Sequence, residues 1–420
     1  MKLLSTAFLM IRRVLNIILV ALLCTNVLAA SPKTRKAVLI VVDGIPAPTM
    51  ERLQPPTLMA IARQGHYHRA YCGGEIGSYS ETPTVSAIGY TNILTGTWMN
   101  KHNVTGNDNL SPNYHYPTLF RIAKDQQRPV TTALYSSWID NRTVLLGENK
   151  DETRNLTIDY VFDGYDQDKT NYPDEKDDLH IQKIDGRVCQ EAARSIRTDA
   201  PDLSWIYLWY TDDAFHAQGH GTVTDKAVMT VDEQLAPVWE AIQYRMREKD
   251  EEWLVIVVTD HGRTFDGHHH GGQSADERTV WMITNQRRTN RQFFRPTLSH
   301  VDINPTICQW MGFQVAEEVA LERDGISFIG KTDIYDLKAE PYDNTVRLRW
   351  QHEGPNTTAT VYIATTNDFS TGGHDKWQKV AEVPAKQEGM SIDLTQYGDS
   401  KFFKFAVKTP YVTLNRWLKR

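Results

Sequence analysis

Four short motifs that lie far apart in the chain carry side chains suited to binding metal ions. The motifs are VVDG, TDDAFHAQGH, VVTDHGR and DGHHHGG, and their candidate ligands are Asp43, Asp212, His216, Asp260, His261 and His270. Three carboxylates and three imidazoles suit two zinc-like cations, because mixed nitrogen and oxygen ligands can leave coordination positions open for a substrate. The set therefore predicts a hydrolytic site with two metal ions.

The spacing within two of these motifs lets both members reach one ion. Asp212 and His216 are four residues apart, so a helical turn would place them on one face, about 6 Å apart. Asp260 and His261 are adjacent, and a turn begun by Gly262 would let both side chains swing to one side. Each pair also has a structural alternative: a helix cap for the first, and a strand-end carboxylate beside a surface histidine for the second.

The two remaining ligands are less distinctive in isolation. Asp43 precedes a glycine at the end of an apolar run, where Asp-Gly turns are common. Three consecutive histidines, His268, His269 and His270, precede a pair of glycines. We predict that His270 is the ligand, because it adjoins the glycines; a solvated histidine-rich loop is the alternative.

Ser86 is the candidate nucleophile and lies in TPTVSAIGYTNILTG, a stretch rich in small and hydroxyl-bearing residues. A metal ion that lowers the pKa of a hydroxyl group can make it nucleophilic without a histidine base. The alternative is a polar loop whose hydroxyl groups cap a helix that starts near Ala87.

Apolar segments that alternate with helical patterns predict the framework for these residues. Segments with the length and composition of strands are 36–44, 131–138, 203–210, 252–260 and 277–284. Helical patterns occupy 55–65, 116–126 and 226–249, and Pro237 is expected to kink or break the last of them. This alternation predicts an α/β fold with a mostly parallel sheet flanked by helices.

Three of the candidate ligands follow predicted strands directly. Asp43, Asp212 and Asp260 each lie at or just beyond the carboxyl end of such a segment, where open α/β sheets bind their ligands. We therefore expect these carboxylates to meet at one edge of the sheet.

Beyond about residue 335 the sequence changes to short alternating strands joined by turn-rich segments. This pattern predicts a small C-terminal β-sandwich, and the LRW strand with its tyrosine and phenylalanine pattern resembles fibronectin type III domains. We predict three parts: a signal peptide over 1–30, a metallohydrolase domain over 31–335 and the β-sandwich over 336–420.

The first thirty residues have the features of a secretory signal peptide: early basic residues, the apolar run 14–23 and small residues at VLAA. The apolar run is short for a membrane span of roughly 20 residues, so we expect cleavage and no transmembrane span in the mature chain. The protein is then secreted or periplasmic.

The cysteine content and the charge limit the class of protein further. Cys24 would leave with the signal peptide, and Cys72, Cys189 and Cys308 allow one disulfide whose pairing the sequence does not fix. The formal net charge of −6 disfavours a nucleic-acid-binding module.

The order of the candidate residues resembles the alkaline phosphatase superfamily, most closely its nucleotide pyrophosphatase/phosphodiesterase branch. The resemblance covers roughly residues 35–330 and includes TGTWMNKHNVTGN and HVDINPTICQWMG. It implies an alkaline phosphatase-like fold with two ligand sets. One metal ion would be held by Asp212, His216 and His270, and the other by Asp43, Asp260 and His261 together with the oxygen of Ser86.

Departures from that branch bear on the substrate. The branch has a threonine nucleophile and an asparagine three residues later that helps to hold a phosphoryl oxygen, whereas this chain has Ser86 and Gly89. Asn92 is the candidate to replace that asparagine as a substrate-binding residue. The aspartate that precedes the nucleophile in the monoesterases is Val85 here.

The motifs and the resemblance together predict an exported hydrolase with two divalent metal ions, zinc by ligand type, that acts through a phosphoseryl intermediate. The expected substrate is a small phosphate diester or pyrophosphate, with nucleotides and lipid head groups as candidates. A phosphomonoesterase, a phosphoethanolamine-type transferase and a non-catalytic exported adhesion or binding protein are the alternatives. A sulfatase is disfavoured, because TVSAIGY lacks the proline and arginine of a CxPxR context.

Overall fold

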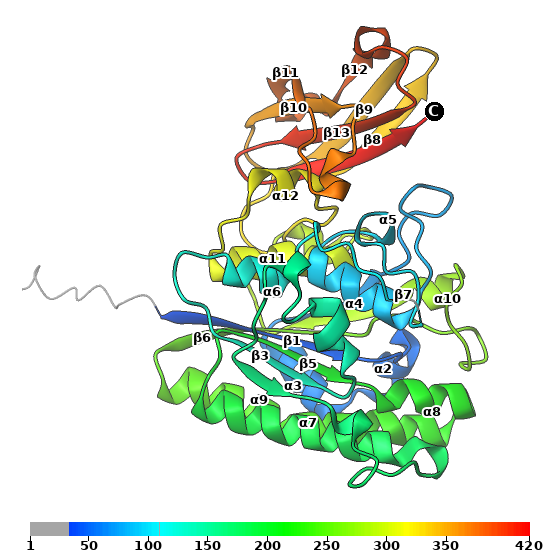
Figure 1. The fold of residues 1–420 in the computed structure, drawn as a ribbon, viewed down its shortest axis with the longest axis vertical. Coiled ribbons are helices and arrows are strands. Elements are labelled where there is room, and N and C mark those ends of the chain that lie inside the picture. Colours follow the sequence, from blue (N-terminus) through cyan, green and yellow to red (C-terminus); the bar gives the residue numbers. More distant parts are fainter. Residues whose placement is uncertain (1–32, 109) are drawn as a thin grey trace, which may run out of the picture. The chain divides into compact units, whose positions relative to one another are not determined.

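A seven-stranded sheet forms the centre of the computed structural model, which describes residues 33–108 and 110–420 (Figure 1). The strands follow the order β2-β7-β6-β1-β5-β3-β4. Their bounds are β1 (Thr34–Val42), β2 (His66–Tyr71), β3 (Thr132–Ser136), β4 (Tyr160–Phe162), β5 (Leu203–Leu208), β6 (Glu251–Val258) and β7 (Thr279–Thr284). The predicted signal peptide, residues 1–30, lies outside the described residues and stays a prediction.

The middle strands of the sheet are buried on both faces. β1 pairs with β5 and β5 pairs with β3, both in parallel, while β7 pairs antiparallel with β2 and β6. Alternate residues of β1 enter two different hydrophobic cores: Leu39 and Val41 on one face, and Val38 and Ile40 on the other. A strand covered on both faces has to be apolar throughout. The predicted α/β fold with a mostly parallel sheet is confirmed.

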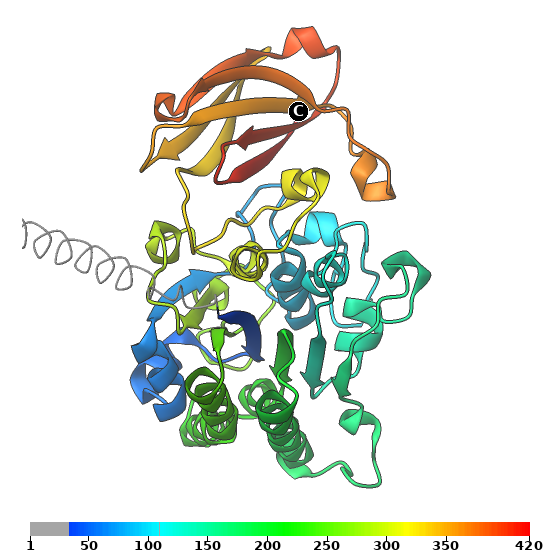
Figure 2. The ribbon, with the colours of Figure 1, turned by 90° about the vertical axis from the view of Figure 1, so that its left-hand side faces the viewer.

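Helices cover both faces of this sheet (Figure 2). The core on one face includes residues of α2 (Ala47–Leu53), α3 (Pro56–Gln64), α7 (Leu179–Thr198), α8 (Tyr210–Gln218) and α9 (Thr222–Glu248). The core on the other face includes residues of α4 (Ser86–Thr95), α6 (Leu119–Lys124) and α11 (Ile303–Met311). Shorter helices are α5 (Met99–His102), α10 (Ala275–Arg278) and α12 (Glu317–Glu322).

Pro237 was expected to kink or break the long helix α9, and the structure corrects the second possibility, because the helix is not broken. The helix runs from Thr222 to Glu248 with Pro237 inside. Leu235 and Trp239, on either side of the proline, are buried in the core, and α9 packs along α7. Packing over this length outweighs the backbone hydrogen bond that proline cannot make.

The C-terminal strands form two antiparallel sheets around a core of their own. The sheet orders are β11-β10-β13-β14 and β12-β9-β8. The bounds are β8 (Ile334–Tyr342), β9 (Thr345–His352), β10 (Thr358–Ala364), β11 (Gln378–Pro384), β12 (Gly389–Asp393), β13 (Phe402–Lys408) and β14 (Thr413–Lys419). On β9, Val346, Leu348 and Trp350 are buried and the residues between them are exposed, as in a strand with one face on a core. The small antiparallel β domain is confirmed, while its boundary at 336 and its fibronectin type III identity stay predictions.

Residues Arg35–Arg420 form one compact unit. Of the helices within the described residues, none combines the length and the apolar character needed to cross a membrane. Cys72, Cys189 and Cys308 are buried free thiols, so the disulfide that the sequence allowed does not form among them.

Candidate active site

The carboxylates predicted to bind metal ions lie at the ends of three strands. Asp43 directly follows β1, and its N–H donates to the carbonyl oxygen of Leu208 at the end of β5 over 3.0 Å. Asp212 lies in the first turn of α8, and Asp260 lies two residues beyond β6. The N–H of Gly44 donates to Asp260 Oδ1 over 2.9 Å, which joins the ends of β1 and β6.

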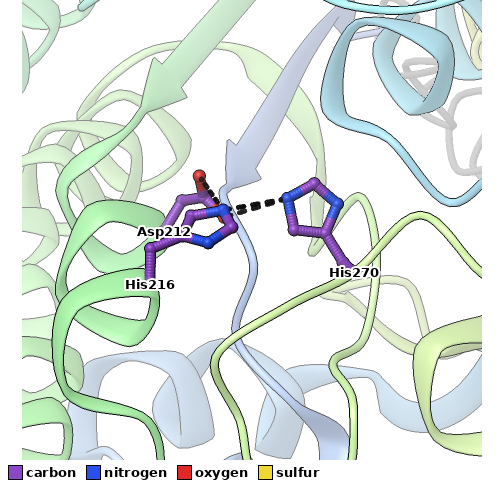
Figure 3. A group of neighbouring side chains, drawn as sticks. All are labelled: Asp212, His216 and His270. Atoms are coloured by element: carbon purple, nitrogen blue, oxygen red, sulfur yellow. Dashed lines mark hydrogen bonds and ion pairs between the residues drawn. The ribbon is translucent and has the colours of Figure 1, made fainter.

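Asp212, His216 and His270 form the first group that could hold a metal ion (Figure 3). His216 Nε2 lies 3.4 Å from Asp212 Oδ2 and 3.0 Å from His270 Nε2, and His270 Nε2 lies 3.8 Å from Asp212 Oδ1. Asp212 and His216 come from the same face of α8, while His270 approaches from the loop that precedes α10. His268 and His269 lie outside this group.

The second group gathers around the Nε2 atom of His261. This atom lies 3.4 Å from Asp43 Oδ1, 3.3 Å from Asp260 Oδ2 and 3.7 Å from Asp212 Oδ1. Ser86 Oγ lies 3.2 Å from the same nitrogen. The structure thus brings six predicted ligands and the predicted nucleophile into one site.

Two buried oxygen atoms in the second group suit a cation as a partner. Asp43 Oδ1 and Asp260 Oδ2 are buried and have no hydrogen-bond donor among the described residues. A buried carboxylate oxygen without a partner costs roughly 1–3 kcal/mol or more, and such groups are rare. Both oxygens lie within 3.4 Å of His261 Nε2, and Asp43, Asp212 and His261 are close enough together to hold one metal ion. The donor set of carboxylate oxygens and imidazole nitrogens is the one zinc binds.

Two of the three imidazoles, His261 and His270, are in the neutral form that binds metal ions, whereas the hydrogen bond with Asp212 raises the pKa of His216. Burial lowers the pKa of His261 to about 4 and the pKa of His270 to about 3, so both are neutral near pH 7. His261 Nδ1 lies 2.9 Å from the carbonyl oxygen of Gly262, and His270 Nδ1 lies 2.8 Å from that of Thr84. Since a carbonyl oxygen only accepts, each ring carries its proton on Nδ1 and leaves the Nε2 lone pair free.

Burial and neighbouring carboxylates raise the pKa of two of the three predicted carboxylate ligands, Asp43 and Asp260. Burial raises the pKa of Asp43 to about 7, and the charge of Asp212 adds to the rise. Burial and the nearby Asp43 also raise the pKa of Asp260 well above its usual range. Burial would raise the pKa of Asp212 as well, but Arg263 and His216 hold it below the usual range. Bound cations would relieve this repulsion.

Ser86 is the first residue of α4 and is buried next to the second group. The N-cap residue of α4 is Val85, and no side chain caps the helix, so capping does not account for the Ser86 hydroxyl. One turn later, a Cβ atom on Gly89 would lie 3.0 Å from the backbone oxygen of Asp260. A residue without a side chain at this position therefore lets α4 pack closely against the end of β6.

Asn92, the predicted substrate-binding residue, contacts a histidine that is not one of the predicted ligands. Asn92 is buried on α4, and its Oδ1 lies 2.8 Å from Nε2 of His102. Asn107, which the sequence did not single out, is exposed, and its Oδ1 accepts the N–H of Ala87 over 3.0 Å. The amide of Asn107 therefore lies beside the nucleophile. Its only signal in the sequence was its place in the segment that follows α4.

Arg263 is a second residue that the sequence did not single out, although it belongs to VVTDHGR. Its guanidinium is buried, pairs with Asp212 Oδ1 and donates to the carbonyl oxygen of Gly44 over 3.1 Å. Gly44 has a φ of +64°, and a Cβ there would meet both Arg263 and Asp212. Arg263 thus fixes one oxygen of a predicted ligand. In the sequence, the only sign of this role was that an arginine directly follows DHG.

Added zinc is expected to stabilise the metal-free protein against unfolding, because only the folded chain assembles the two groups. At about a hundred times the dissociation constant, one site adds about 2.7 kcal/mol to the free energy of unfolding. The His270→Ala variant should lose part of this gain, whereas His269→Ala, which alters an exposed neighbour outside the first group, should keep it. Thermal melting with and without zinc after chelation measures both; equal gains in the two variants would contradict the assignment of His270.

Comparison with known proteins shows which solved structures this chain is similar to. No curated protein matches the sequence. The structure of a 2-O GAG sulfatase superposes with a TM-score of 0.51 at 13% identity, over 87% of this chain and 86% of the other, which shows a shared fold. A phosphonoacetate hydrolase from Sinorhizobium meliloti matches with a TM-score of 0.40 at 17% identity, over 55% and 57% of the two chains. The lipoteichoic acid synthase from Listeria monocytogenes matches with a TM-score of 0.43 at 12% identity, over 81% and 88%.

The segment that holds every predicted ligand is also the segment that a family model matches. This match covers residues 37–270, which is more than half of the chain. The chain therefore belongs to the type I phosphodiesterase/nucleotide pyrophosphatase family, within the alkaline phosphatase superfamily.

Proposed function

We propose that the protein is a two-metal phosphodiesterase that acts through a phosphoseryl intermediate on Ser86. The observation that carries this proposal is the position of Ser86 Oγ, 3.2 Å from His261 Nε2. The same nitrogen lies within 3.4 Å of two buried carboxylate oxygens that have no donor in the part of the chain that the structure describes. A hydroxyl group at the centre of a metal-binding donor set is the arrangement that a metal-activated nucleophile requires.

The donor atoms divide into two sets. In the second group, Asp43, Asp260 and His261 with the Ser86 oxygen would hold one ion. The first group, Asp212, His216 and His270, would hold the other. Bound zinc ions would supply Lewis acidity to the hydroxyl group, the phosphoryl oxygens and the leaving group.

Residues of the chain position the reacting phosphate. Ser86 begins a ten-residue helix, α4, and the partial positive charge at a helix N-terminus favours the phosphoryl group at this point. Because Asn107 Oδ1 is held by the N–H of Ala87, its Nδ2 is free to donate to a phosphoryl oxygen. Ser86 Oγ forms a bond to phosphorus while the bond from phosphorus to the leaving oxygen breaks, and the hydroxyl proton ends on the departing alcohol. In the second step a water oxygen attacks phosphorus, the bond from phosphorus to Oγ breaks, and a water proton returns to Ser86.

The family membership favours a diester or pyrophosphate over a monoester, and Val85 supports this choice because the monoesterases have an aspartate there. A small phosphate ester, such as a nucleotide or a lipid head group, is the proposed substrate class.

We propose that the protein is exported through the segment 1–30. The strand order of the C-terminal sheets, three strands against four, supports a fibronectin type III-like domain.

Three aryl esters test the reaction in parallel. For the zinc-loaded protein, we expect the kcat/KM for bis-p-nitrophenyl phosphate to be at least about tenfold higher than the kcat/KM for p-nitrophenyl phosphate. A tenfold ratio corresponds to about 1.4 kcal/mol of transition-state stabilisation. No release of p-nitrophenol is expected from p-nitrophenyl sulfate. A faster monoester would identify a phosphomonoesterase, and no hydrolysis of any ester at full metal loading would favour a non-catalytic binding protein.

A further inference from the structure

The two oxygen atoms of the Asp43 carboxylate have different surroundings. Oδ2 accepts hydrogen bonds from the hydroxyl groups of Tyr90 and Tyr207, the latter over 2.7 Å. Oδ1 has no donor among the described residues and lies 3.4 Å from His261 Nε2. The carboxylate is therefore held by one oxygen and offers the other to the second metal group.

The two phenols reach Asp43 from different elements. Tyr207 lies on β5 opposite Val41 of β1, so it stands beside the strand that ends at Asp43. Tyr90 lies on α4, four residues after Ser86 and on the same face of the helix. The phenol oxygens are 2.9 Å apart, and the ring centroids are 4.9 Å apart.

Both tyrosines are packed so that their hydroxyl groups have little freedom. Tyr90 and Tyr207 are 1% and 2% exposed. The Tyr90 ring also lies edge-on to Trp205 and Trp138, each with ring centroids 6.4 Å from it. Phenols locked in a core can fix a carboxylate in one rotamer, which a hydrogen bond from a mobile surface group cannot do.

We propose that Tyr90 and Tyr207 are positioning residues that hold Asp43 with Oδ1 directed at the metal ion of the second group, the one beside His261. This inference rests on the proposed function, since it assigns the two residues to a metal ligand. Residues that hydrogen-bond to a metal ligand and fix its orientation typically raise the metal affinity by about 10–100-fold. Because Tyr90 shares a helix face with Ser86, it also fixes the distance between the nucleophile and this ligand.

Zinc affinity in competition with a chelator tests the proposal. In the Tyr90→Phe/Tyr207→Phe variant, one of the two zinc ions is expected to bind about 10–100-fold more weakly. The other ion, on Asp212, His216 and His270, should keep its affinity. The matched control is Tyr135→Phe, which removes the hydroxyl group of an equally buried tyrosine on β3 that stacks on Phe162.

The comparison separates positioning from a structural role. The free energy of unfolding of the metal-free variants is measured as well, and Tyr207→Phe alone serves if the double variant does not fold. Zinc affinities within about twofold of the wild type at both sites would overturn the proposal, as would an equal loss in Tyr135→Phe. If wild-type protein binds no zinc, the proposed function itself fails. If wild-type protein binds two ions and the variants bind both with the wild-type affinity, only this inference fails.

Discussion

Replacing Ser86 by alanine is expected to lower kcat by at least about 10³-fold, because the phosphoryl group then has no acceptor on the enzyme. Ser86 Oγ is the hydroxyl oxygen next to His261 Nε2, and it opens the helix that faces the metal groups. The six other ligands remain in the variant, so the metal content should stay near two ions per chain. Steady-state hydrolysis of bis-p-nitrophenyl phosphate and elemental analysis of the same sample measure both quantities.

Two neighbouring hydroxyl groups provide the controls for this prediction. Thr91 lies on the same helix and donates to the backbone oxygen of Ala87, so Thr91→Val removes a hydroxyl group without touching the site. Its kcat should stay near that of the wild type. Thr84 Oγ1 donates to the carbonyl oxygen of Gly272 over 3.0 Å and is thereby engaged. If Ser86→Ala retained most of the activity, water would be the direct nucleophile and the phosphoseryl step would be wrong.

The fold could be predicted where burial leaves a simple pattern in the sequence. β1, β5 and β6 are covered on both faces and are therefore continuous apolar runs. β2 was missed, because its sequence HYHRAY is half-buried and polar at the edge of the sheet. The course of α9 could not be predicted either, because local rules end a helix at Pro237 and only the packing on α7 overrides them.

In the candidate site, too, residues that lie in short motifs could be predicted, whereas residues whose role depends on contacts between distant segments could not. The ligands could be predicted because each lies in a short motif, and because Asp43, Asp212 and Asp260 follow strands whose ends share one edge of an α/β sheet. Asn107, Tyr90 and Tyr207 were not found, because their roles depend on contacts across 20 to 164 positions of the chain. A phenol in a core segment has the same pattern as any other buried aromatic residue. Residues that orient a ligand therefore become visible only in three dimensions.

The C-terminal β domain is joined to the catalytic part of the chain by buried charges. Lys404 of β13 is fully buried, with its Nζ 2.7 Å from Glu322 Oε1 at the end of α12 and 2.7 Å from Asp375 Oδ2. The ammonium group also lies 4.9 Å from the ring centroid of Trp417. Lys101 of α5 is buried nearby and donates to the backbone oxygen of Glu322 over 2.6 Å. Lys101 Nζ also donates to Asn415 Oδ1 of β14 over 3.0 Å. The contacts of Lys404 and Lys101 thus tie α12 and α5 to the β domain.

Replacing Lys404 by methionine is expected to lower the free energy of unfolding by about 3–5 kcal/mol, since it leaves two buried carboxylates without their cation. Glu322 and Asp375 cannot turn to water, because their side chains are 2% and 1% exposed. Urea denaturation at pH 7 measures the loss as a lower midpoint at an unchanged slope. The control is Lys379→Met, which breaks an exposed pair with Glu382 and should cost less than about 1 kcal/mol. Equal losses in the two variants would mean that the Lys404 cluster is no stronger than a surface ion pair.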